Sequence, residues 1–161
     1  MIFAAVSLHK YPFPRFGDWL KQAIKDGHIK EPIIYQHGSS PAITDVPLIK
    51  SIRDMPYDQF MKHIKNSSLF ISHGGMGCLT QSLAIGKVPI MIPRRNDGVE
   101  HIDDNQSLTC KLITDEFGIK SAYTYEEFVH MLMNPPKVPK LKSDKPKLLK
   151  YLDDITSHLV D

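Results

Sequence analysis

The sequence is poor in cysteine and has no long hydrophobic run, and both features limit the classes of protein to which it can belong. Its two cysteines, Cys78 and Cys110, are too few for a disulfide framework or a zinc site and indicate a reducing compartment. No apolar stretch approaches the roughly 18 residues that a membrane-spanning helix needs. The apolar start, residues 2–8, has no basic region before it and is too short for a signal peptide. We therefore expect a cytoplasmic protein that reaches a membrane only through a partner.

The sequence also lacks a strong excess of charge of one sign. A net charge of +2 at pH 7 gives no broad case for nucleic acid as a partner. The lysines are unevenly distributed, because six of them and a single acid lie between residues 137 and 150. This run could contact anionic lipid or an acidic partner, or it could be a solvated tail.

Several signatures of catalysis and metal binding are absent. There is no GxxxxGK[ST] motif, which argues against P-loop phosphoryl transfer, and no GxGxxG after the first apolar run, which argues against a dehydrogenase. A GxSxG motif is missing too, so a typical serine hydrolase is not expected. The histidines show neither HExxH nor a clustered spacing, and we expect no bound metal.

Short apolar runs alternate with helical patterns along the chain. The runs that favour strands are 1–6, 32–36, 46–49, 69–71, 88–93 and 118–123, and the helical patterns are 14–26, 57–66, 78–85, 100–113 and 124–133. This alternation predicts an α/β fold, a Rossmann-like parallel sheet with helices on both faces, in residues 1–134. We expect a Pro/Lys-rich linker over 135–146. An amphipathic helix is expected over 147–161, which either packs on the domain or docks a partner.

The stretch from Leu69 to Gln106 concentrates the glycines and polar residues that chemistry requires. Its first apolar run leads into His73 and the glycine-rich segment Gly74–Gly77, and a helical pattern follows. Glycines at such a junction allow a tight turn and the close approach of a ligand, and the N-terminus of the helix attracts an anion. This segment is therefore either a simple turn or a cradle for a phosphate-bearing ligand, and His73 is either a core histidine or part of that cradle.

Polar side chains follow four of the predicted strands, and the loops that carry them begin at residues 9, 36, 73 and 94. Ligands bind beyond the carboxyl ends of parallel strands, so we expect these loops to share one rim. His9 suits a general base because the ordinary pKa of histidine is near neutral, although it could also be a plain loop residue. Arg94 and Arg95 could bind phosphate or be exposed charges, and Asn105 and Gln106 could bind sugar hydroxyls or be surface residues.

Three sequence blocks form a recognisable pattern. They are residues 70–77 (FISHGGMG), 86–94 (GKVPIMIPR) and 100–106 (EHIDDNQ). Together they resemble the C-terminal domain of family 28 glycosyltransferases, which have the GT-B architecture of two Rossmann-like halves with a nucleotide-sugar in the cleft. The start of the chain resembles free-standing versions of this domain. These are the catalytic subunit of the two-part UDP-GlcNAc transferase of the dolichol pathway and, more closely, the small subunits of bacterial exopolysaccharide or capsule transferases.

The resemblance implies a site for a UDP-sugar donor, with no cofactor and no metal. The residues that it assigns to donor binding are His73, Gly74, Gly75, Met76, Gly77, Gln81, Arg94, His101, Asp104, Asn105 and Gln106, and it places the loop Ile52–Met55 near the uracil. An acceptor hydroxyl would attack the anomeric carbon with inversion, while the helix dipole and Arg94 stabilise the departing UDP. The base would be His9 in this chain or a residue of the partner.

The resemblance also implies a partner subunit. A GT-B enzyme needs a second half, and 161 residues do not include one. We therefore expect a membrane-anchored subunit that supplies the acceptor-binding half, together with a lipid-linked saccharide acceptor at the inner face of the plasma membrane. The chain would be the donor-binding, catalytic subunit of a heteromeric hexosyltransferase in exopolysaccharide synthesis.

The sequence departs from the family pattern in three places. Ser7 and Leu8 stand where the family has Gly-Thr, Gln81 replaces an acid that bonds the ribose, and Asn105 replaces a histidine. These departures leave two rival functions open. One is an enhancer or regulatory subunit of the same complex with a degenerate donor site, and the other is a plain nucleotide-binding module.

Overall fold

The computed structural model describes residues 1–138, which form a single parallel sheet flanked by helices. The strands are ordered β3-β2-β1-β4-β5, and every neighbouring pair is parallel. The elements are β1 (Ile2–Ala5), α1 (Pro14–Lys25), β2 (Ile33–Gln36), β3 (Ile49–Ile52), α2 (Tyr57–Asn66), β4 (Leu69–His73), α3 (Met76–Ala84), β5 (Ile90–Ile92), α4 (Asn105–Phe117) and α5 (Tyr125–Met133). The predicted Rossmann-like α/β fold is confirmed.

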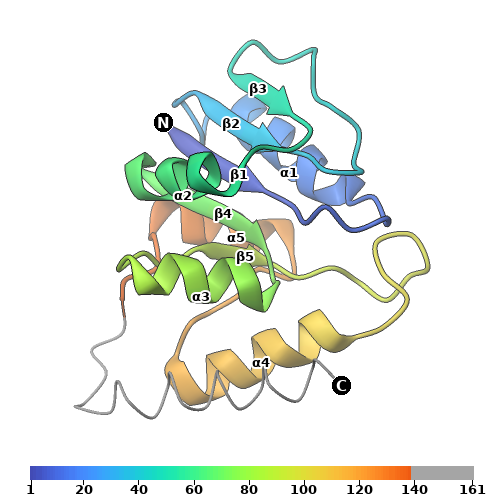
Figure 1. The fold of residues 1–161 in the computed structure, drawn as a ribbon, viewed down its shortest axis with the longest axis vertical. Coiled ribbons are helices and arrows are strands. Elements are labelled where there is room, and N and C mark those ends of the chain that lie inside the picture. The colour runs from blue at the N-terminus through green and yellow to red at the C-terminus, as the bar shows by residue number, and fades with distance from the viewer. Residues whose placement is uncertain (139–161) are drawn as a thin grey trace.

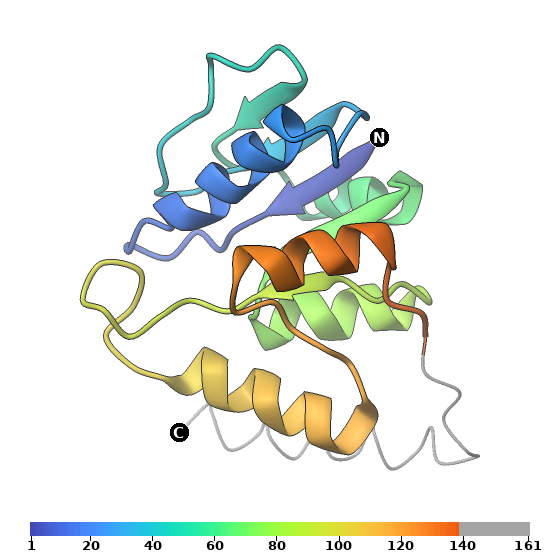
Figure 2. The same cartoon turned by 180° about the vertical axis from the view of Figure 1, so that it is seen from behind.

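Helices cover both faces of the sheet. The face seen in Figure 1 carries α2 and α3, and the opposite face, seen in Figure 2, carries α1 and α5. The latter two helices contact each other, because Trp19 of α1 stacks on Phe128 of α5 with ring centroids 5.8 Å apart. Beside β5, the side chain of Cys110 in α4 shares a buried cluster with Leu79 of α3 and Met91 of β5.

The central position of β1 explains its unbroken apolar sequence. Its four side chains are at most 4% exposed, because β2 and β4 flank it and helices cover both of its faces. On one face, Phe3 stacks on Phe70 and packs edge-on against Phe60 of α2. On the other face, Ala4 joins the core that α1 and α5 cover.

Two strand predictions differ from the structure. The third strand spans Ile49–Ile52 rather than 46–49, because Pro47 has no N–H to donate to a ladder. Residues 118–123, predicted as a last strand, contribute an isolated bridge between Met91 and Ser121 instead of a paired strand. The bridge still brings this segment beside β5.

Helix boundaries differ where backbone N–H groups find other partners. The helix predicted over 100–113 begins at Asn105 and ends at Phe117. In the loop before it, Asp97 accepts hydrogen bonds from two backbone N–H groups, which favours a turn over a helix. The helix after the glycine-rich segment begins at Met76, two residues earlier than predicted.

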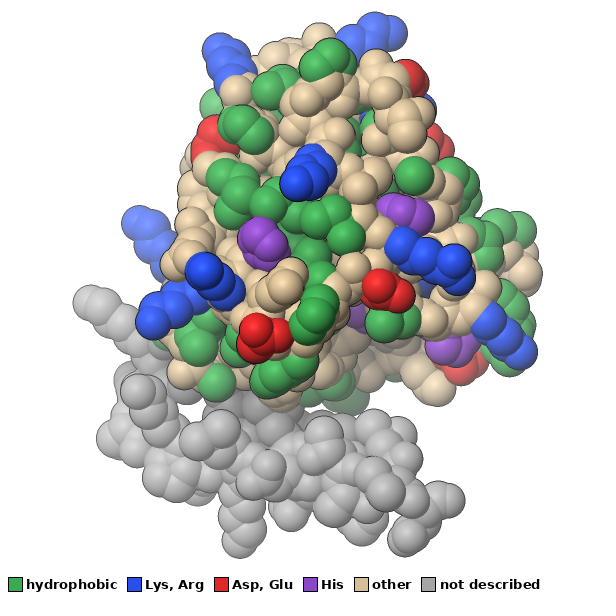
Figure 3. Space-filling view, turned by 45° about the horizontal axis from the view of Figure 1, so that its top comes forward, with side chains coloured by type: hydrophobic (Ala, Val, Ile, Leu, Met, Phe, Trp, Pro, Cys, Tyr) green, Lys and Arg blue, Asp and Glu red, His purple; other side chains and the backbone are tan. Residues whose placement is uncertain are grey.

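The C-terminal part of the chain stays a prediction. Most of the expected linker over 135–146, and all of the expected helix over 147–161, lie outside the described residues. Within residues 1–138 no helix combines the length and the apolar character that crossing a membrane requires. On the face seen in Figure 3, positive and negative side chains are scattered among hydrophobic ones.

Candidate functional site

The candidate site lies where the order of the strands reverses. From β1 the chain passes through α1 to β2 and β3 on one side, and then through α2 to β4 on the other side of β1. In open parallel sheets, the crevice beyond the carboxyl ends of two such strands is the usual place for a ligand. The loops after β1 and β5 extend from this end of the sheet (Figure 1).

Hydrogen bonds join the loops of this rim, as predicted. Arg94, after β5, donates to the carbonyl of Tyr11, after β1, at 2.9 Å. The Phe13 N–H donates to Ser40 Oγ, after β2, at 2.8 Å. The loop after β2 also meets the expected uracil loop, because the Gly38 N–H donates to the Arg53 carbonyl at 2.9 Å.

The three glycines after β4 lie in different surroundings. A Cβ on Gly74 would lie 2.6 Å from Cys110 Sγ and 3.1 Å from Pro93 Cα, so this position lets β4 and α4 pack closely. A Cβ on Gly75 would collide with the ring of His73. A Cβ on Gly77 would meet nothing within 4 Å, although this residue lies in the first turn of α3. Packing therefore explains the first two glycines and leaves the third unexplained.

The N-terminus of α3, beside the open space at Gly77, has no side-chain cap. The N-cap residue is Gly75, which has no side chain to cap the helix. The first N–H groups of a helix have no partner inside the helix, and the dipole makes this end positive. An anion could therefore bind at Met76 and Gly77. Gln81, one turn further along α3, is half-buried.

His73 lies buried beside the glycines and is 6% exposed. Its Nδ1 has no hydrogen-bond partner. Burial, and next the charge of Arg94, lower the pKa of His73 to about 4, although the Ala5 backbone opposes the shift. The ring is therefore neutral at pH 7 and contributes no positive charge to the crevice.

Arg94 is buried and acts as a brace between loops. It is 1% exposed, and its Nη1 donates to the carbonyls of Tyr11, Pro12 and Glu100 at 2.9, 3.1 and 2.9 Å. Its guanidinium carbon also lies 4.8 Å from the centre of the Phe13 ring. In this structure the guanidinium of Arg94 donates hydrogen bonds to backbone carbonyls, and its contact with a diphosphate stays a prediction.

A second arginine, which the sequence did not single out, completes this brace. Arg15 of α1 donates to both carboxylate oxygens of Glu100, at 2.8 and 2.7 Å, and to the Pro93 carbonyl at 2.8 Å. Glu100 Oε2 also accepts the Arg95 N–H at 2.9 Å. Glu100 thus holds the loop after β5 against α1.

His9 stacks in a small aromatic cluster at the outer edge of the rim. The centre of its ring lies 5.1 Å from that of Tyr11 and 5.2 Å from that of His101. His101 Nδ1 lies 3.0 Å from Asp103 Oδ1. Partial burial, followed by the charges of His101, Arg94 and Lys10, lowers the pKa of His9, while Asp103 raises it. The exposed ring is therefore mostly neutral at pH 7, as a proton acceptor must be.

The remaining predicted residues lie at the start of α4. Gln106 Oε1 accepts the Arg94 N–H at 3.3 Å, and Asp104 accepts a bond from the Asn96 side chain at 3.2 Å. The Asn105 backbone N–H donates to Asp103 at 3.0 Å, and the Asn105 side chain is exposed, where its amide can reach a ligand. Within residues 1–138, no group of three or more His, Cys, Asp or Glu side chains could hold a metal ion.

The sequence also matches the model of a known protein family. The model of the glycosyltransferase family 28 C-terminal domain matches residues 18–153, which is most of the chain. No curated protein matches the sequence. The matched range includes the glycine-rich segment and the loop after β5, whereas His9 and Arg15 precede it. The chain belongs to the glycosyltransferase family 28 C-terminal domain family.

Proposed function

We propose that this chain is the donor-binding subunit of a heteromeric, inverting glycosyltransferase that moves a sugar from a UDP-sugar to a lipid-linked acceptor in exopolysaccharide synthesis. Family membership supports glycosyl transfer. The observation that carries the proposal is the open, uncapped first turn of α3, where Gly77 leaves room that packing does not require.

In this mechanism the diphosphate of the donor sits at the N-terminus of α3. The oxygen of the acceptor hydroxyl forms a bond to the anomeric carbon as the bond from that carbon to the diphosphate oxygen breaks. The hydroxyl proton passes to neutral His9, and negative charge develops on the departing UDP. The N–H groups and dipole of α3 stabilise that charge without reorganising.

The donor sugar would lie between the start of α4 and His9. The exposed Asn105 amide carries both donors and an acceptor for sugar hydroxyls. His101 stacks on His9 and contacts Asp103, and both residues shift the pKa of His9, so the charge state of the base depends on the same loop that binds the sugar. The brace from Arg94 and Arg15 to Glu100 keeps this loop in place.

The proposed partner would bind beside this loop. Val99 and Ile102 in the loop, and Leu108 and Leu112 on one side of α4, are each more than half exposed. Exposed apolar side chains that lie close together are typical of interaction surfaces. We propose that a membrane-anchored subunit covers them and brings the acceptor to the inner face of the plasma membrane.

Calorimetry of the purified chain with UDP and a panel of UDP-sugars tests the donor site, first alone and then with the co-expressed partner. We expect binding of UDP and of at least one UDP-sugar. Absence of binding in both preparations contradicts the catalytic role. It would favour the enhancer subunit instead, a role that Gln81 in place of the ribose-binding acid supports.

A further inference from the structure

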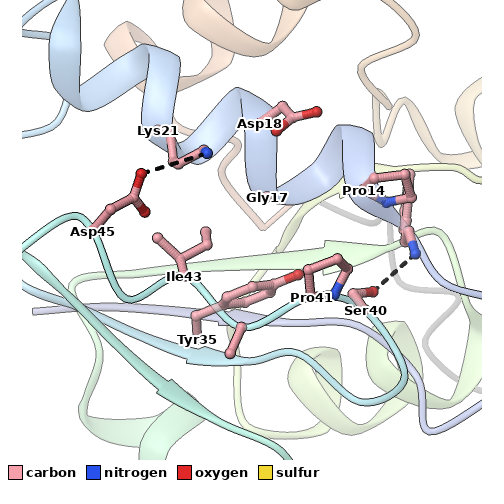
Figure 4. A pocket seen from close by; sticks show the side chains of 11 residues that line it. Pro14, Gly17, Asp18, Lys21, Tyr35, Ser40, Pro41, Ile43 and Asp45 are labelled. Carbon is pink, nitrogen blue, oxygen red and sulfur yellow. Dashed lines mark hydrogen bonds and ion pairs between the residues drawn. The ribbon is translucent and has the colours of Figure 1, made fainter.

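The loop after β1, which joins it to α1 and carries His9, is held to the domain at both of its ends. At the start of the loop, the Val6 N–H donates to the Gln36 carbonyl at 3.0 Å. At its end, the Phe13 N–H donates to Ser40 Oγ at 2.8 Å (Figure 4). These two bonds fix the ends of the loop but do not involve the residues next to His9.

Arg94 contacts this loop on both sides of His9. Its guanidinium touches one residue before His9 and three after it, namely Ser7, Tyr11, Pro12 and Phe13. The shortest of these bonds run from Nη1 to the carbonyls of Tyr11 and Pro12, at 2.9 and 3.1 Å. Hydrogen bonds that a charged group donates are stronger than neutral ones. One side chain thus holds the path of the loop around His9.

Arg94 is itself held firmly by the opposite side of the rim. It is 1% exposed, and its Nη1 also donates to the Glu100 carbonyl at 2.9 Å. Its N–H donates to Gln106 Oε1 at 3.3 Å, and its carbonyl accepts from Ser107 Oγ at 3.4 Å, so the first turn of α4 holds its backbone. The loop after β1 is therefore tied, through Arg94, to the segment after β5 and to α4.

These contacts leave the guanidinium of Arg94 little capacity for a phosphate. Among the described residues, its Nε is buried and has no hydrogen-bond partner, so this donor is out of reach of a ligand. A diphosphate that took the Nη1 protons would remove them from the carbonyls of Tyr11 and Pro12, and an acceptor that loses its donor is destabilising. The first turn of α3 offers a phosphate free N–H groups without that cost.

The charge of Arg94 also acts on His9. The charged or titratable groups that influence the exposed ring are Arg94, Lys10, His101 and Asp103. Partial burial and His101 lower the pKa of His9 most, Arg94 comes next, and Asp103 opposes them. Loss of the Arg94 charge should therefore raise this pKa, whereas a lysine at the same position should keep most of the effect.

We propose that Arg94 is a positioning residue for His9 and does not bind the diphosphate of the donor. It holds the loop after β1 so that the His9 ring stays stacked on Tyr11 and His101, whose ring centres lie 5.1 and 5.2 Å away. The effect of Arg94 on transfer rests on the proposed function, in which His9 accepts the proton of the acceptor hydroxyl. The position of the ring does not depend on that function.

The test compares two variants of the full chain by NMR of the histidine side chains. Arg94→Met removes the charge and the hydrogen bonds, whereas Arg94→Lys keeps the charge but lacks the planar fork that bridges several carbonyls. We expect the His9 ring signals to lose the shift caused by stacking in both variants, and the pKa of His9 to rise mainly in Arg94→Met. Arg95→Met is the matched control and should leave His9 unchanged, because the exposed Arg95 side chain donates to the Tyr123 carbonyl instead.

Calorimetry with UDP and transfer assays with the co-expressed partner separate positioning from phosphate binding. In both Arg94 variants we expect UDP affinity and the KM for the UDP-sugar to be unchanged, and kcat to fall at least about tenfold. Arg94→Lys is the milder change and suffices if Arg94→Met does not fold.

The inference is overturned if the His9 signals of both Arg94 variants match those of the original chain, or if UDP affinity falls at least tenfold in either variant. If UDP binds to none of the proteins, including the original chain, the proposed donor site fails, and the His9 signals alone decide whether Arg94 positions the ring.

Discussion

Arg15 and Glu100, 85 residues apart in the chain, form a bidentate ion pair with both side chains nearly buried. The pair joins α1 to the loop after β5, and no local sequence pattern links the two positions. Breaking one side of a buried pair leaves an uncompensated charge, which usually costs about 3–5 kcal/mol.

We expect Glu100→Ala to lower the free energy of unfolding by about 3 kcal/mol, because Arg15 then keeps a buried charge without its carboxylate. Chemical denaturation measures the change. Glu116→Ala, at an exposed acid of α4, is the control and should change stability by less than about 0.5 kcal/mol. In a double-mutant cycle, Arg15→Ala and Glu100→Ala should be strongly non-additive; simple additivity would show that the pair does not act as a unit.

Two glycines of the same segment should respond to alanine with opposite signs. Gly74→Ala places a Cβ against the backbone at Pro93 and against Cys110 Sγ, so we expect clear destabilisation. Gly77→Ala enters open space in a helix and should stabilise the domain by up to about 1 kcal/mol. Thermal unfolding of the two variants measures this, and a loss of stability in Gly77→Ala would contradict the open geometry.

The same position tests where the diphosphate binds. A side chain on Gly77 occupies the space in which we place a phosphate, so Gly77→Val should weaken UDP binding at least tenfold while the fold is kept. Gly27 also meets nothing within 4 Å, but its φ of +77° makes it a poor control for substitution. Lys25→Ala, at the exposed end of α1, is the better control for calorimetry. Unchanged UDP affinity in Gly77→Val would move the diphosphate elsewhere.

The neighbours of His9 should move its pKa in opposite directions. In the folded chain this pKa lies below the ordinary value of 6.5, with His101 lowering it and Asp103 raising it. We therefore expect His101→Gln to raise the pKa of His9 and Asp103→Asn to lower it further, as measured by NMR titration of the imidazole ring. If His9 is the base, the rate of transfer falls with decreasing pH through an inflection below 6.5, and His101→Gln moves that inflection upward. Equal shifts in both variants would exclude the electrostatic coupling.

Buried His73 should make the fold sensitive to acid. Its pKa is lowered from 6.5 to about 4 on folding, so the unfolded chain binds the proton more tightly. Its contribution to stability is complete above pH 6.5 and is lost as the pH falls towards 4, on the order of 3 kcal/mol in all. His73→Asn lacks this dependence. Urea denaturation measures the stability of both proteins between pH 7 and 4. As the pH decreases, the original chain should lose stability relative to His73→Asn, and parallel curves for the two proteins would contradict the prediction.

Much of the fold follows from local patterns. Thr124 and Glu127 have the spacing of a capping box, and the structure confirms both of its hydrogen bonds at the start of α5. The apolar run at 1–6 predicts a strand covered on both faces, and β1 is the buried centre of the sheet. Turn chemistry and apolar periodicity act over a few residues, so they can be read without knowing the fold.

Local patterns are less reliable where a segment depends on distant partners. Residues 118–123 have the composition of a strand, yet they meet β5 through a single bridge at Ser121. The loop before Asn105 has helical periodicity, but hydrogen bonds from backbone N–H groups to the carboxylates of Asp97 and Glu100 keep it from forming a helix. In both places tertiary contacts outweigh local propensity.

Local sequence thus determined β4, the glycine-rich segment and α3, because glycine and a helix N-terminus have the same properties in any fold. The environment of each rim side chain was decided by tertiary structure. Arg94 looks like a free cation in the sequence but is buried among carbonyls from two loops. The reason is that the order of the strands, rather than any short segment, determines which distant loops meet.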